Sequence, residues 1–204
     1  MIVIIDYDVG NVSAIANMLS RLGFNSSITK NPKDIEKANR IILPGNGSYD
    51  TCLKNIRSTN LMPLLERKVL KEGTPLLGIC VGAQMLGNSS EEGIERGFGW
   101  IDMVVEKFPI TLNHPVPNMG WRRVNSSISF HYMIRDLNQD SRFYFVHSYF
   151  MKPKFDKNIL LTSEYGFEFA AGVINKNIIG VQFHPEKSHF YGKKLLTAFA
   201  LGEI

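Results

Sequence analysis

Two short segments contain residues whose types and spacing suit nucleophilic catalysis. The first is Gly78-Ile79-Cys80-Val81-Gly82, in which an apolar run ends in a cysteine between two glycines. Such glycines permit the sharp strand-to-helix turn that presents a nucleophile. The helix start favours negative charge on the sulfur, and the Val81 N–H is placed to donate to an oxyanion. We therefore predict that Cys80 is a nucleophile, and we interpret Cys52, which has no such context, as a small buried apolar residue.

The second segment, His184-Pro185-Glu186, could supply the base. If the chain is extended there, His184 and Glu186 point to the same side. The carboxylate would then orient the imidazole, which could take the proton of Cys80. A solitary His-x-Glu pair is usually a surface ion pair, so its value comes from the nucleophile. No histidine shows a zinc-ligand spacing with the cysteines, and we predict no metal site.

The elements that must position these residues form two patterns. In the first half, apolar runs at 2–5, 24–29, 40–43 and 76–79 alternate with helical segments at 11–22, 50–57 and 61–71 and with a helix opened by Asn31-Pro32. This alternation predicts an α/β fold with a mostly parallel sheet flanked by helices. The second half contains short β-like runs at 101–107, 120–124, 143–149, 159–163, 169–174 and 178–183, then a closing helix at 188–201. We expect antiparallel strands added to the sheet, within a single domain over residues 1–204.

Composition narrows the function classes. The 204 residues are 44% hydrophobic and 21% charged, which is typical of a globular protein. The net charge is +4 without a run of Lys and Arg longer than two, so we expect no nucleic-acid binding. Two cysteines suit a reducing compartment. The first residues do not resemble a signal peptide, and no apolar run is long enough to span a membrane, so we expect a cytoplasmic protein without membrane contact.

Gly78–Gln84 together with His184–Glu186 resembles the class I (triad) glutamine amidotransferases. The resemblance extends over nearly the whole chain through the segments at 6–11, 43–48, 89–93, 118–121 and 144–149. It implies a flavodoxin-like sheet and hydrolysis of glutamine to glutamate and ammonia without a cofactor. In that chemistry Cys80 forms a thioester, His184 transfers protons and Glu186 orients His184.

The same resemblance implies further site residues. The oxyanion hole would use the Val81 N–H and an N–H of the loop that contains Gly45 and Asn46. Asn46 departs from the valine that is usual in the family. The residues implied to bind substrate are Gln84, Glu92, His147, Ser148 and Tyr149, the last three through their backbone. Considered without the resemblance, His147 lies in an aromatic run and would be structural.

The segments at 118–121 and 144–149 resemble a branch whose members are glutaminase subunits. These subunits pass ammonia through a tunnel to a barrel-shaped cyclase subunit in histidine biosynthesis. The resemblance places Asn11, Trp121, Tyr144 and Lys187 at that interface. Without it, Asn11 would be a helix cap, Trp121 a half-buried aromatic, Tyr144 a strand aromatic and Lys187 a solvated lysine.

Three alternatives stay open. Similar paralogues supply ammonia to sugar amidotransferases in bacterial surface-polysaccharide synthesis, and Asn118 and Arg122 depart from the histidine-pathway pattern. A non-catalytic scaffold subunit would have no need of a nucleophile. Cysteine peptidases and DJ-1-like proteins also use a cysteine at such a turn, but they do not account for Gln84, Glu92 and the His-Pro-Glu segment together.

Overall fold

The parallel strands of the first half form the part of the fold that carries the candidate nucleophile and base. The computed structural model describes residues 1–109, 114–128 and 130–202. Five strands stand side by side in the order β2-β1-β3-β4-β13, all parallel to one another. They are β1 (Ile2–Ile5), β2 (Ser26–Thr29), β3 (Arg40–Leu43), β4 (Leu76–Ile79) and β13 (Ile178–Val181). This is the flavodoxin-like order, in which ligands bind beyond the carboxyl ends of the strands.

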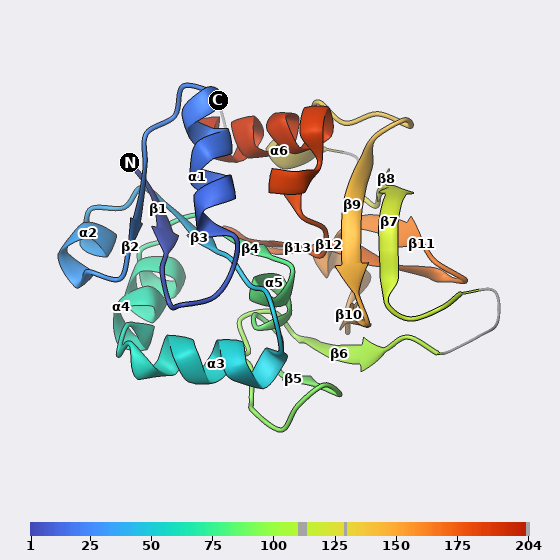
Figure 1. Ribbon diagram of the computed structural model, residues 1–204, viewed down its shortest axis with the longest axis horizontal. Helices are drawn as coiled ribbons and strands as arrows, with labels where there is room; N and C mark the ends of the chain where they lie inside the picture. Colours follow the sequence, from blue (N-terminus) through green and yellow to red (C-terminus); the bar gives the residue numbers. More distant parts are fainter. Residues whose placement is uncertain (110–113, 129, 203–204) are drawn as a thin grey trace.

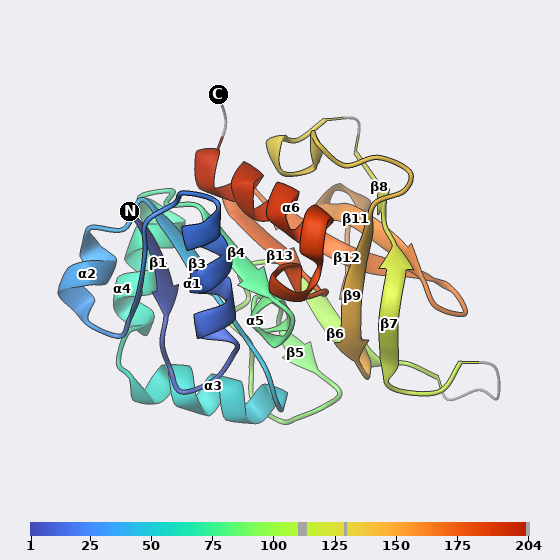
Figure 2. The same cartoon turned by 45° about the horizontal axis from the view of Figure 1, so that its top comes forward.

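Helices cover both faces of this sheet (Figures 1 and 2). They are α1 (Val12–Arg21), α2 (Pro32–Glu36), α3 (Tyr49–Ser58), α4 (Met62–Glu66), α5 (Val81–Gln84) and α6 (His189–Leu201). Helices α1 and α6 lie side by side on one face, and α3 and α4 lie on the other. Every residue of β1, β4 and β13 is buried, as expected for strands covered on both sides.

Antiparallel strands extend the sheet beyond β13. They are β12 (Glu168–Asn175), β10 (Tyr149–Pro153), β6 (Met103–Lys107), β11 (Ile159–Glu164) and β8 (Asn125–Ser126), with β5 (Ser89–Ser90) parallel to β6 at the edge. A separate antiparallel pair packs beside them and consists of β7 (Asn118–Arg123) and β9 (Arg142–His147). The predicted α/β fold with added antiparallel strands is therefore confirmed.

The prediction of one strand over residues 143–149 was wrong. Strand β9 ends at His147 and pairs with β7, whereas β10 starts at Tyr149 and pairs with β6. The chain changes partner at Ser148, and only the tertiary pairing decides where. The helix predicted over residues 61–71 is α4 followed by a π-helical turn, Arg67–Lys71. Strands β5 and β8, of two residues each, are too short to leave a periodic pattern.

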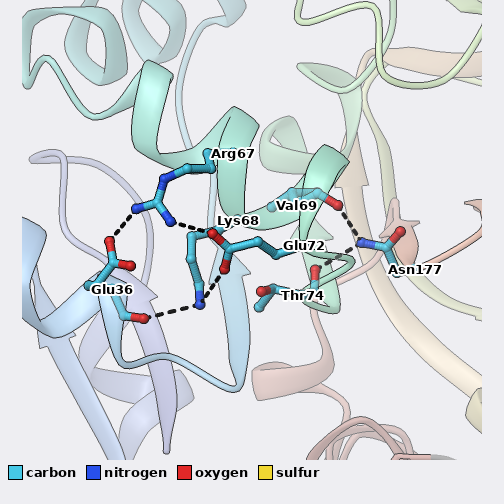
Figure 3. Close-up of polar contacts among 7 residues, drawn as sticks. All are labelled: Glu36, Arg67, Lys68, Val69, Glu72, Thr74 and Asn177. Atoms are coloured by element: carbon cyan, nitrogen blue, oxygen red, sulfur yellow. Dashed lines mark hydrogen bonds and ion pairs between the residues drawn. The ribbon is translucent and has the colours of Figure 1, made fainter.

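A polar cluster ties β4 and β13 together at the end of the sheet where both strands begin (Figure 3). Asn177 lies in the turn before β13, and its side-chain amide donates to the carbonyls of Val69 and Thr74, both at 2.9 Å. The Asn177 carbonyl accepts from the Leu76 N–H at 3.0 Å. Beside it, Arg67 bridges Glu36 and Glu72. The two strands whose far ends carry Cys80 and lead to His184 thus begin in a fixed register.

Candidate active site

Cys80 stands at a strained turn between β4 and α5. Its φ of 55° and ψ of −115° are values that side-chain-bearing residues rarely adopt. The Cys80 N–H donates to the Val181 carbonyl at 2.8 Å, which holds the turn against β13. A Cβ on Gly82 would lie 2.1 Å from the Leu43 oxygen, and one on Gly78 2.8 Å from the Ala83 Cα. The predicted strand-turn-helix geometry and its need for both glycines are confirmed.

His184 and Glu186 form a buried pair, His184 Nδ1 to Glu186 Oε1 at 2.8 Å. The premise that the chain is extended there was wrong, because Pro185–Lys187 form a 3₁₀ turn. The turn instead folds the Glu186 carboxylate back onto the ring. The His184 N–H donates to the Tyr144 carbonyl of β9 at 3.0 Å, and Ser188 Oγ donates to the His184 carbonyl at 2.6 Å. The ring is therefore positioned by β9 as well as by β13.

The environment of His184 favours its charged form. Burial alone lowers the pKa of His184, but its interactions with Cys80 and Glu186 outweigh burial and raise that pKa to about 10. Within the described residues, His184 Nε2 has no partner at hydrogen-bond geometry. Cys80 therefore raises the pKa of His184 because it lies close to the ring, without a formed hydrogen bond between them. Catalytic hydrogen bonds are often long until substrate binds.

Cys80 borders a cavity of about 300 Å³. The residues that line it are Asn46, Gly47, Cys80, Val81, Gln84, Glu92, Pro117, Val146, His147, Ser148 and Tyr149. The residues predicted to hold the oxyanion and the substrate thus gather in one place, with Gly45 as the exception. Gly45 does not line the cavity but packs against the start of α5, where a Cβ would come within 2.1 Å of the Gly82 nitrogen.

Two side chains from other parts of the chain contact the backbone of the loop that follows β3. Tyr7 Oη donates to the Pro44 carbonyl, and Cys52 Sγ lies 3.6 Å from the Asn46 carbonyl oxygen. Because the C=O and N–H of a trans peptide point in opposite directions, the Gly47 N–H points away from Cys52 and α3. Cys52 is fully buried, as predicted, and burial raises its pKa to about 11.

Hydrogen bonds hold the side chains of Glu92 and Gln84, which line the cavity. Glu92 Oε2 accepts from the Tyr49 N–H at 3.2 Å, and burial raises the pKa of Glu92. Gln84 Nε2 donates to the Tyr149 carbonyl at 3.1 Å and to Gln182 Oε1 at 3.0 Å. Gln182 Nε2 in turn lies 3.9 Å from Cys80 Sγ. Gln182 was missed by the sequence analysis, although it lies two residues before His184.

His147 is buried, and burial favours its neutral form. Its Nδ1 lies 2.7 Å from the Tyr149 carbonyl, and its Nε2 lies 2.9 Å from Asn118 Nδ2. Burial, the Tyr149 contact and the charges of His184 and Arg122 together give it a pKa lowered to about 4, with burial as the largest cause. The side chain of His147 therefore has a structural role, while its backbone lines the cavity. Both expectations for this residue can hold at once.

Three of the four residues expected at a partner interface lie together away from the cavity. Trp121, Tyr144 and Lys187 surround a shallow hollow of about 270 Å³ with His189, which the sequence analysis missed. The rings of Trp121 and His189 stack with centroids 5.5 Å apart. Asn11 occupies the N-cap position of α1, as the helix-cap interpretation predicts, and its carbonyl accepts from the Ile15 N–H at 3.2 Å, although its side chain makes no capping hydrogen bond.

The described part of the chain contains neither a candidate metal cluster nor a candidate membrane-spanning helix. Residues 1–109, 114–128 and 130–202 contain no group of three or more His, Cys, Asp or Glu side chains that could hold a metal ion. None of the helices in those ranges has the length and apolar character that crossing a bilayer requires.

The chain is similar to a known protein family and to several named proteins. Residues 3–201 match the family described as glutamine amidotransferase class-I. A Methanococcus maripaludis protein named imidazole glycerol phosphate synthase subunit HisH 2 is 48% identical, over 98% of both chains. A Pseudomonas aeruginosa protein of the same name is 45% identical at the same coverage. The Leptospira interrogans imidazole glycerol phosphate synthase subunit HisH is 40% identical, over 98% of this chain and 99% of its own.

Solved structures agree on the fold. The structure of PurLQS from Thermotoga maritima aligns with a TM-score of 0.73 at 20% identity, covering 97% of this chain and 96% of that chain. A glutamine amidotransferase from the same organism aligns with a TM-score of 0.64, covering 97% of this chain and 81% of its own. At this level of identity the likeness concerns the fold alone.

Proposed function

This chain belongs to the class I glutamine amidotransferase family, and we propose that it is the glutaminase subunit of an imidazole glycerol phosphate synthase. The observation that carries the proposal is the buried His184–Glu186 pair beside Cys80, at the edge of a cavity large enough for an amino acid. The two HisH 2 relatives, at 48% and 45% identity, support the choice of synthase.

In the proposed first half-reaction, the Cys80 thiolate attacks the side-chain amide carbon of glutamine. The amide oxygen becomes an oxyanion, stabilised by the N–H groups of Val81 and Gly47. Val81 is the first residue of α5, where N–H groups have no partner within the helix. The His184 imidazolium gives its proton to the amide nitrogen, the C–N bond breaks, and ammonia leaves a thioester on Cys80. Glu186 stabilises the imidazolium and fixes the ring.

In the second half-reaction, neutral His184 takes a proton from water, and the resulting hydroxide attacks the thioester carbon. The C–S bond then breaks, Cys80 leaves as a thiolate, and glutamate is released. The sum is glutamine plus water to glutamate plus ammonia. Gln84 and Glu92, together with the backbone of His147, Ser148 and Tyr149, would hold the amino acid in the cavity that they line.

The proposed partner is a HisF-type cyclase that consumes the ammonia. Trp121 supports an interface because it is 42% exposed and stacks on His189 rather than packing into the core. Tyr144 joins this surface to the site, since its carbonyl accepts from the His184 N–H at 3.0 Å. Docking near Trp121 and Tyr144 would therefore contact the strand that positions the catalytic base.

Labelling with a glutamine-derived diazo ketone tests the site. We expect a single adduct on Cys80, slowed by added glutamine and absent from Cys80→Ser. The matched control is Cys52→Ser, which should label like the parent because Cys52 is buried beneath the loop. Labelling that glutamine does not slow, or that survives Cys80→Ser, would refute the assignment.

A further inference from the structure

A chain of side-chain hydrogen bonds leads from β7 to the wall of the glutamine cavity. Arg122 Nε donates to Asn118 Oδ1 at 3.1 Å. Asn118 Nδ2 lies 2.9 Å from His147 Nε2. His147 Nδ1 lies 2.7 Å from the Tyr149 carbonyl oxygen. Asn118 and His147 also face each other in the β7–β9 pairing, so the backbone register supports the side-chain contact.

The chemistry of the groups fixes the direction of every bond. A carbonyl only accepts, so His147 Nδ1 carries the hydrogen that reaches Tyr149. Arginine only donates, so it must meet the oxygen of Asn118 and leaves the amide NH₂ facing His147. His147 Nε2 must then accept, which requires the neutral ring. The burial that lowers the pKa of His147 to about 4 acts in the same sense.

The last acceptor of this chain belongs to the cavity. The Tyr149 carbonyl receives a second hydrogen bond, from Gln84 Nε2 at 3.1 Å. His147, Ser148 and Tyr149 all line the cavity, at the point where the chain leaves β9 and enters β10. Ser148 is paired in neither strand, and its carbonyl accepts a backbone hydrogen bond from the Phe108 N–H at 3.0 Å. The side chains of His147 and Gln84 therefore add to the backbone contacts that position this segment.

Arg122 is itself held in place from a second side. Its guanidinium lies 4.6 Å from the centroid of the Tyr165 ring, a cation–π geometry. Neighbouring Arg123 differs, because its side chain is 68% exposed and its guanidinium lies 3.7 Å from the carboxylate of Asp140. The alternation of a strand turns Arg122 and Arg123 to opposite faces. The pair offers a test residue and a matched control on one strand.

We propose that Arg122 and Asn118 are positioning residues for glutamine binding, an inference that rests on the proposed function. Arg122 sets the orientation of the Asn118 amide, and Asn118 holds His147 as the neutral Nδ1–H tautomer. That tautomer fixes the Ser148–Tyr149 backbone that receives the substrate. Neither residue touches the reacting atoms.

Steady-state glutaminase kinetics of the complex with its cyclase test the proposal. For Arg122→Met we expect the KM for glutamine to rise about tenfold, the size of one lost hydrogen bond, with kcat changed less. Arg122→Lys keeps a donor and should recover part of the KM. Arg123→Met should behave like the parent. An unchanged KM in Arg122→Met, or an equal rise in Arg123→Met, would overturn the proposal.

A second readout does not depend on activity. The ¹⁵N NMR signals of the His147 ring should report the neutral Nδ1–H form in the parent at mildly acidic pH. Asn118→Asp replaces the donor with a carboxylate, so it should convert the ring to the charged form under the same conditions. A ring that keeps the neutral tautomer in Asn118→Asp would contradict the proposed role of Asn118. If the parent releases no glutamate while the NMR result holds, the proposed function fails and the hydrogen-bond chain stands.

Discussion

At the scale of residues, the site depends on a cysteine backbone that few side chains adopt. A conformation such as that of Cys80 costs on the order of 1–3 kcal/mol and persists only where its surroundings enforce it. Here the Val181 carbonyl holds the Cys80 N–H, and the Cys80 carbonyl accepts from the Ala83 N–H at 3.0 Å. Gly78 and Gly82 make this packing possible, and of the two, Gly82 has the closer approach to neighbouring backbone.

Gly82→Ala should therefore disrupt both fold and activity. The added Cβ would lie 2.1 Å from the Leu43 oxygen, which is backbone and cannot yield. We expect a loss of about 3 kcal/mol in the free energy of unfolding, measured by denaturant titration, together with loss of glutaminase activity. Gly23→Ala is the control, because a Cβ on Gly23 would have open space around it, although φ there is +84°. Equal effects of the two substitutions would contradict the packing argument.

Asn46→Val tests the loop beside the oxyanion. Asn46 is exposed, and asparagine tolerates unusual backbone angles better than β-branched valine does. We hypothesise that the peptide orientation of this loop is easier to change with Asn46 present. Valine should then lower the glutaminase rate measured without the cyclase by about threefold and widen the stimulation by the cyclase. Unchanged basal and stimulated rates would refute the hypothesis.

At the scale of elements, the sequence predicted the parallel half better than the antiparallel half. Continuous β-branched runs such as Ile2–Ile5 are typical of strands buried on both faces, and Pro44-Gly45 mark the end of the run at 40–43. Residues 143–149 form one largely aromatic run with β-like character, so the change of pairing partner at Ser148 left no local signal. His184 and Glu186 were correctly paired for a wrong reason, since a turn rather than a strand joins them.

Asn177→Ala tests the anchor at the far end of the same strands. The substitution removes the hydrogen bonds to the Val69 and Thr74 carbonyls. We expect the melting temperature to fall by about 4 °C, as for a loss of 1–2 kcal/mol, with kcat unchanged at temperatures well below unfolding. Lys176→Ala, at the exposed neighbouring position, is the control. A fall in kcat without a fall in melting temperature would contradict a purely structural role.

At the scale of the whole molecule, the site combines a motif visible in the sequence with contacts that only the fold creates. Cys80, His184 and Glu186 could be predicted because their types and spacing are local. Gln84, Glu92 and residues 147–149 were predicted only through the family resemblance, and they line the cavity. Gln182, Asn118, Arg122 and His189 could not, because each acts through a partner on another strand or helix. Asn118 and Arg122 were noticed only as departures from a family pattern.

Two buried histidines, His147 and His184, should make the free energy of unfolding depend on pH. One should lower it toward acidic pH, and the other should lower it toward alkaline pH. The pKa of His147 is lowered to about 4 from 6.5, so the unfolded chain binds the extra proton and stability falls as pH drops through that window. The pKa of His184 is raised from 6.5 to about 10, so the folded chain binds the extra proton and stability falls as pH rises. Thermal unfolding across pH measures both effects.

The variants separate the two histidines. His147→Gln should flatten the acid side of the profile, and His184→Gln should flatten the alkaline side. Each variant keeps the other histidine, so each serves as the control for the other. A profile that keeps both slopes in both variants would mean that other groups set the pH dependence.

Glutamate release by the purified protein tests the central claim most directly. It is measured with the protein alone, and with a histidine-pathway cyclase from the same source and the nucleotide substrate of that cyclase. We predict strong stimulation by the loaded cyclase and its complete loss in Cys80→Ser. Release only with a sugar amidotransferase would keep the triad chemistry and overturn the choice of partner. No release under any condition, or release that survives Cys80→Ser, would contradict the assignment of this chain as a triad glutaminase.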